Sequence, residues 1–73
     1  MTQGERVRQV RKELGLTLEK FGERIGMKKN SISQIENGKN SVTDQVIKSI
    51  CREFNVDYTW LTTGKGGSIQ HFD

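Results

Sequence analysis

Apolar residues recur at helical spacing through most of this 73-residue chain, and that period limits the fold to short packed helices. Val7, Val10 and Leu14 lie at i, i+3 and i+7 with charged residues between them, so they share one helix face. Residues 47, 50 and 54, which are Ile, Ile and Phe, repeat this spacing further along. No segment alternates apolar and polar residues over the length of a strand, and the sequence therefore predicts an all-α fold.

The chain contains no proline, so each helix depends on a capping side chain at its start and on glycine or asparagine at its end. Thr17, Thr43 and Asp57 are the predicted N-caps, whereas Gly15, Gly26, Asn37, Gly38 and Asn55 are the predicted stops. These signals predict five helices: one that carries Val7, Val10 and Leu14 and stops at Gly15, then Leu18–Arg24, about Lys28–Glu36, a fourth that follows the Thr43 cap and ends at Asn55, and a short fifth at Tyr58–Gly64. Further apolar residues expected in the core are Phe21, Ile25, Ile32, Ile35, Trp60 and Leu61.

A chain of this length holds one small domain, which we assign to residues 1–66, followed by a flexible glycine-rich tail at 67–73. A single cysteine, Cys51, excludes an internal disulfide, and with a single histidine, His71, it excludes a Cys/His zinc cluster. We expect no cofactor, because a core this small has no room for a sizeable pocket. With no leader peptide and no apolar stretch of membrane-spanning length, the chain is expected in the cytoplasm, away from membranes.

The sequence contains no catalytic constellation, and it is therefore not predicted to be an enzyme. His71 lies in the predicted tail, and Cys51 lies on the apolar stripe of the fourth helix as a small hydrophobic residue. The sequence "GKGG" near the end lacks the strand–loop–helix setting of a phosphate-binding loop.

The functional signal lies in the second and third predicted helices. They are joined by a tight turn at Gly26, and the small Gly22 stands where the two helices have to pack closely. Two short amphipathic helices in this arrangement are typical of a helix-turn-helix, whose second helix lies in the DNA major groove.

Lys28 and Lys29 begin the third helix, where the positive end of the helix dipole disfavours cations. Residues 1–40 carry nine Lys/Arg against five Asp/Glu, a balance of +4, whereas residues 41–73 carry three against four, a balance of −1. A DNA phosphate or a guanine edge would supply the missing negative charge. A lost cap costs about 1 kcal/mol, against about 1–3 kcal/mol of discrimination from a good base contact. The alternative is two long side chains solvated at little cost.

The stretch "GLTLEKFGERIGMKKNSISQIENGK" resembles the phage-repressor and Cro-like, or Xre-family, helix-turn-helix regulators. The resemblance continues through "ICREFNVDYTWLTTGKG" and covers about residues 4–66. It implies a compact five-helix, lambda-repressor-like DNA-binding domain that binds double-stranded DNA. It further implies a transcriptional repressor of prophage or mobile-element type that acts as a homodimer on a palindromic operator.

The same resemblance assigns roles to individual residues. The positions that face the bases match Lys28, Lys29, Asn30, Ser33 and Gln34. The positions that touch phosphates match Thr17, Asn37, Lys39 and Asn40, and a partly buried ion pair matches Arg11 and Glu36. Many relatives have glutamine at the position of Leu18, which commonly anchors a phosphate, and Ser or Thr at the position of Lys28. Here the anchor would come from the Thr17 hydroxyl, backbone N–H groups or Lys20.

A second hypothesis from another class stays open, because a fold does not fix a function. The chain could be an antitoxin or coactivator-type module that uses this fold to bind a protein partner, such as a toxin or an anti-repressor. For the homodimer, candidate contact residues are Val56, Tyr58, Trp60, Ile69 and Phe72. Each has an equally good reading as part of the domain's own core or of the tail.

Overall fold

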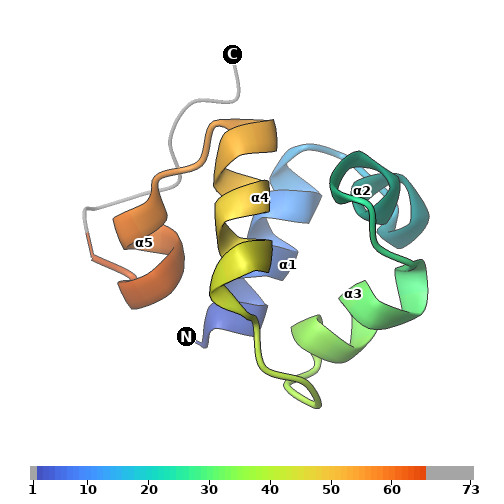
Figure 1. Cartoon of the computed structure of the whole chain (residues 1–73), viewed down its shortest axis with the longest axis horizontal. Coiled ribbons are helices and arrows are strands. Elements are labelled where there is room, and N and C mark those ends of the chain that lie inside the picture. The colour runs from blue at the N-terminus through green and yellow to red at the C-terminus, as the bar shows by residue number, and fades with distance from the viewer. Residues whose placement is uncertain (1, 66–73) are drawn as a thin grey trace.

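All five predicted helices are present in the computed structural model, which describes residues 2–65 (Figure 1). They are α1 (Gln3–Glu13), α2 (Leu18–Ile25), α3 (Lys29–Glu36), α4 (Asp44–Phe54) and α5 (Tyr58–Thr63). No strand occurs in the described part of the chain, and the all-α prediction is confirmed. The predicted tail at 67–73 and the domain boundary before it lie outside the described residues.

The three predicted N-caps act through local hydrogen bonds. The side-chain oxygens of Thr17, Thr43 and Asp57 accept from backbone N–H groups three residues further on, at 3.1, 3.3 and 2.8 Å. A fourth cap was not predicted. Thr2 and Glu5 form a reciprocal capping box, with bonds of 2.7 and 3.1 Å. Because of this box, α1 begins at Gln3, earlier than the apolar period alone indicates.

The helices enclose one apolar core. Helix α1 packs on α3 and α5, α2 packs on α3 and α4, and α4 packs on α5. The rings of Phe21 and Phe54 stack with their centroids 4.9 Å apart, and Arg24 lies over Phe54 while bonding Glu53 at 2.7 Å. These contacts tie α2 to α4. The fully buried side chains are Val7, Val10, Phe21, Ile32, Ile50 and Leu61.

Two of the five residues considered for a dimer contact belong to this core. Val56 and Trp60 are only 5% and 6% exposed, so their reading as core residues is correct. Tyr58 is 43% exposed and donates a 2.6 Å hydrogen bond to a carboxylate oxygen of Asp44. Residues 69 and 72 lie outside the described part of the chain.

Two glycines set how closely the helices approach. A Cβ atom at Gly22 would collide with the carbonyl oxygen of Met27, in the turn between α2 and α3. A Cβ at Gly4 would collide with the carbonyl oxygen of Ile35, so α1 passes α3 at backbone distance. The helix-turn-helix is therefore held by backbone contacts as well as by apolar side chains.

A buried arginine connects α1 to the end of α5. Arg6 of α1 donates from Nε to the carbonyl oxygen of Leu61 at 2.7 Å and from Nη2 to that of Thr62 at 3.0 Å. Gln3 donates to the same Thr62 oxygen at 3.1 Å. These cationic and amide donors satisfy carbonyl groups that have no intrahelical partner at the end of α5.

Candidate nucleic-acid interface

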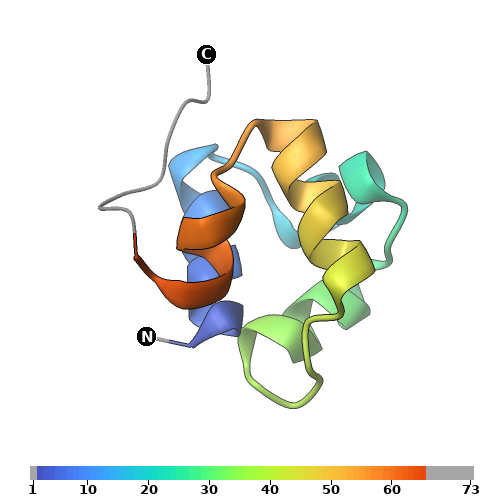
Figure 2. The same ribbon diagram turned by 60° about the vertical axis from the view of Figure 1, so that its left-hand side comes forward.

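Helices α2 and α3 lie on the right of Figure 1 and α5 lies on the left, with α1 and α4 between them; in the turned view of Figure 2, α3 lies at the bottom of the molecule. Along α3, Ile32, Ile35 and Glu36 are buried. The outward row of α3 consists of Lys29, Asn30, Ser33 and Gln34, at i, i+1, i+4 and i+5. Three of these side chains are exposed, and Ser33 is half-buried. The spacing places this row on the side of the helix opposite the buried residues. The predicted base-facing side chains are therefore directed away from the core.

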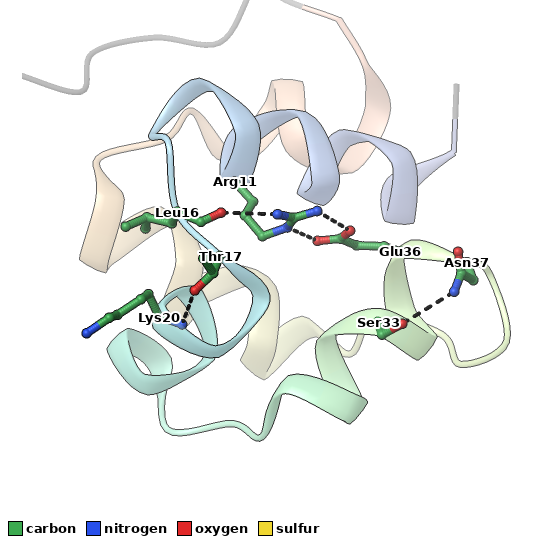
Figure 3. Close-up of polar contacts among 7 residues, drawn as sticks. All are labelled: Arg11, Leu16, Thr17, Lys20, Ser33, Glu36 and Asn37. Atoms are coloured by element: carbon green, nitrogen blue, oxygen red, sulfur yellow. Dashed lines mark hydrogen bonds and ion pairs between the residues drawn. The ribbon is translucent and has the colours of Figure 1, made fainter.

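An ion pair joins α1 to the last turn of α3 (Figure 3). Arg11 Nε and Nη2 donate to the two carboxylate oxygens of Glu36 at 2.7 and 3.1 Å, and Nη1 donates to the carbonyl oxygen of Leu16 at 3.1 Å. The side chains are only 14% and 5% exposed. The hydrogen bond to Glu36 raises the pKa of Arg11, so the guanidinium stays charged. This bidentate pair fixes where the end of α3 lies relative to α1.

The first turn of α3 carries positive charge that neither a capping side chain nor an acidic residue of that turn neutralises. Lys28 occupies the N-cap position and makes no side-chain capping bond, and the first turn holds no acidic residue. Among the described residues, Lys28 and Lys29 make no ion pair, and both are exposed. Two exposed lysines therefore begin a helix whose first backbone N–H groups have no capping side chain, which is an arrangement that favours an anion.

Acidic side chains of α2 lie beside these lysines, a neighbourhood that the sequence pattern does not predict. Glu19 and Glu23 line a depression of about 370 Å³ together with Met27 and residues 28–30. Neither glutamate comes within ion-pair distance of a lysine of the described chain at this depression. The i, i+4 spacing of the two glutamates on α2 was the available signal, because it places both on one face.

The surface formed by α2 and the outward row of α3 has the predicted phosphate-contacting residues at its two edges. Thr17 is exposed at the start of α2, and because its hydroxyl accepts from Lys20 N–H, its own hydrogen remains available to a phosphate (Figure 3). Asn37 donates to Ser33 Oγ at 3.4 Å at the end of α3. Lys39 and Asn40 are exposed in the following loop.

The structure also joins two residues for which the family resemblance implies different roles. Asn40 Nδ2 donates to Oε1 of Gln34 at 2.6 Å, so a predicted phosphate contact meets a predicted base contact. The two are six residues apart across the end of a helix, and no helical or strand period indicates such a pair. The "NG" at the helix end was the available signal, because it indicates a chain that folds back.

Other kinds of site find no support in residues 2–65. Within that range no group of three or more His, Cys, Asp or Glu side chains could hold a metal ion. Nor is any helix of that range long and apolar enough to cross a membrane. Burial raises the pKa of the half-buried Cys51 thiol, which makes it less reactive as a nucleophile.

Comparison with known proteins gives a family match and two curated relatives. Residues 4–67 match the family described as "Helix-turn-helix domain". The chain is 38% identical over 66 residues to the propionyl-CoA carboxylase regulator of Cereibacter sphaeroides, covering 90% of this chain and 14% of that protein. It is 40% identical over 55 residues to antitoxin PezA of Streptococcus pneumoniae, covering 75% of this chain and 35% of that protein. The chain thus spans only a minor part of each curated relative.

Solved structures share the fold. The P22 c2 repressor in complex with synthetic operator 9T superposes with a TM-score of 0.80 at 23% identity, covering 89% of this chain and 98% of that one. The clp gene regulator ClgR from C. glutamicum superposes with a TM-score of 0.74 at 22% identity, covering 81% and 77%. With the family match over residues 4–67, the resemblance to Cro-like regulators is confirmed. The chain therefore belongs to the family described as "Helix-turn-helix domain".

Proposed function

We propose that this chain is a sequence-specific transcriptional repressor, of prophage or mobile-element type, that acts in the cytoplasm and reads double-stranded DNA with α3 in the major groove. The observation that carries this proposal is the outward row of α3, whose amine, amide and hydroxyl groups are directed away from the core. Lysine can donate to guanine O6 and N7, whereas asparagine and glutamine can pair with adenine N6 and N7.

The two edges of the α2–α3 surface carry side chains that can bind DNA phosphates. Thr17 lies at one edge, and Asn37, Lys39 and Asn40 lie at the other, so phosphates on both sides of the groove have partners. Lys28 and the uncapped start of α3 supply a further site of positive potential. Phosphate contacts would fix the position of α3, and the outward row would then distinguish base pairs.

A homodimer on a palindromic operator is part of this proposal. One copy has a longest extent of 29 Å, which is less than the roughly 34 Å between successive major grooves on one face of the duplex. A second copy beside the first would reach the next groove. Tyr58, which is the exposed large hydrophobic residue of the described chain, is our candidate for the contact between copies.

The test begins with selection of bound sequences from random duplex DNA, followed by affinity measurements on the selected site. Lys29→Ala and Gln34→Ala should each lose about 1–3 kcal/mol of discrimination between base pairs. Their melting temperatures should stay near that of the wild type, since both side chains are exposed. The matched control is Lys48→Ala on α4, an exposed lysine paired with Asp44 at 3.1 Å. Binding of all three variants equal to that of the wild type would remove α3 from the interface.

A second candidate function rests on the likeness to antitoxin PezA. In that case the same surface could bind operator DNA while another face binds a toxin or, alternatively, an anti-repressor. Coexpression with the product of the neighbouring gene, followed by sedimentation, would detect a stable stoichiometric complex. If the protein sediments unchanged beside that product, the partner hypothesis fails for it.

A further inference from the structure

The end of α3 folds back onto Gln34. Gly38 has a left-handed backbone, with φ of 79°, so the chain reverses immediately after the helix. As a result, the backbone N–H groups of Lys39 and Asn40 both point at the carbonyl oxygen of Gln34, at 2.9 and 3.3 Å. This is the pattern of a Schellman ending, and Gly38 N–H completes it by donating to Ile35 at 3.1 Å. The loop is therefore anchored on the backbone of one residue.

The side chains of the same two residues also meet. Asn40 Nδ2 donates to Oε1 of Gln34 at 2.6 Å, although both residues are exposed. Backbone and side-chain bonds together connect the loop to Gln34 at three points. An isolated surface glutamine has three free torsions, whereas this one is restrained by a neighbour that is itself fixed by the backbone.

We infer that Asn40 is a positioning residue for Gln34. Before DNA is bound, it holds the Gln34 amide in the orientation in which that amide contacts a base. This inference rests on the proposed function, in which Gln34 faces a base and Asn40 lies near a phosphate. Through this contact, the loop proposed to bind the DNA phosphates would control how strongly Gln34 discriminates between base pairs. A residue that touched only phosphate would act equally on every sequence.

The expected size follows from the cost of ordering one flexible side chain on binding. A glutamine that is already held avoids most of that cost, and its release should weaken discrimination at its base pair by about two- to tenfold. The effect should be confined to that base pair, because the side-chain hydrogen bond of Asn40 within the described structure goes to Gln34 and not to another residue of the outward row.

The binding experiment measures wild type, Asn40→Ala, Gln34→Ala and the double variant on the selected site and on sites altered one base pair at a time. Asn40→Ala should lose discrimination at the base pair where Gln34→Ala loses it. In the Gln34→Ala background, Asn40→Ala should change affinity only uniformly. The control is Asn37→Ala, another exposed asparagine of this edge, which bonds Ser33 instead of Gln34. A uniform loss from Asn40→Ala in the wild-type background would overturn the inference.

A measurement without DNA separates this inference from the proposed function. Side-chain ¹⁵N relaxation of the free full-length chain should show Gln34 Nε2 more ordered in the wild type and in Asn37→Ala than in Asn40→Ala. Equal mobility in all three would refute the positioning contact even if the wild type binds a specific operator. An ordered Gln34 in a wild type with no sequence preference would instead refute the proposed function, and the positioning role with it.

Discussion

At the scale of single residues, the ion pair between Arg11 and Glu36 shows how burial changes the weight of a charge contact. Its two bonds, of 2.7 and 3.1 Å, lie almost out of solvent, whereas the Arg24–Glu53 pair of similar length is largely exposed. Removing one partner of a buried pair leaves the other charge desolvated without compensation. Exposed pairs lose little, because water replaces the partner.

We therefore expect Glu36→Ala to lower the free energy of unfolding by about 3–5 kcal/mol. Glu53→Ala, the exposed control, should cost less than about 1 kcal/mol. Urea unfolding of both variants measures the difference, and the double variant Arg11→Leu/Glu36→Leu should be less damaged than Glu36→Ala. Similar losses from Glu36→Ala and Glu53→Ala would mean that the Arg11 pair does not hold α3 in place.

At the scale of the element, α3 combines a weak start with a strong end. Lys28 gives no capping bond, whereas at the other end the backbone N–H groups of Gly38 and Lys39 donate to the carbonyl oxygens of residues 35 and 34. A serine at position 28 would satisfy a backbone N–H group at the helix start, which lysine does not do. The lysine is thus unfavourable for the isolated helix and favourable for an anion nearby.

Lys28→Ser should therefore shift stability and DNA affinity in opposite directions. We expect a gain of about 0.5–1 kcal/mol in the free energy of unfolding. We also expect weaker binding, with the slope of log affinity against log salt reduced by about 0.9. The control is Lys29→Ser, which removes a cation one residue inside the helix and supplies no cap. Unchanged affinity and slope in Lys28→Ser would place this lysine away from DNA.

At the scale of the whole molecule, α5 lies apart from α2 and α3. Arg6 and Gln3 of α1 hold the end of α5 in place on the left of Figure 1, whereas α2 and α3 lie on the right. The exposed Tyr58 lies on α5, so a contact between copies there would leave both copies of α3 uncovered. Such an arrangement is isologous, because the same patch serves both subunits.

If this contact exists, two copies should bind each palindromic site cooperatively. Tyr58→Ala should reduce that cooperativity, whereas Tyr58→Phe keeps the ring and should preserve it. In Tyr58→Phe the pKa of Asp44 should rise toward its ordinary value, because the Tyr58 hydrogen bond is the main cause of its lowering. Sedimentation with and without DNA measures the stoichiometry, and a carboxylate NMR titration measures the pKa. One copy per site at saturation would exclude the dimer.

The helices, and the starts of α2, α4 and α5, were predictable because they depend on local chemistry. Thr17 and Asp57 are recognisable as caps, since the N–H that each accepts from is three residues away. Arg6 could not be foreseen as a buried residue, because its acceptors are backbone carbonyls of residues 61 and 62, which carry no sequence signature. The Asn40–Gln34 bond was missed for a related reason, since it requires the reversal at Gly38 in three dimensions.

The contact at Gly22 has a consequence for redesign. Because α2 meets the turn before α3 through main-chain atoms, the crossing of the two helices does not depend on which side chains α3 displays outward. Different side chains could be substituted at positions 29, 30, 33 and 34 without changing how α2 and α3 pack. If α3 reads DNA as proposed, a new target sequence would require substitutions on this helix alone, with no change to the packing beneath it.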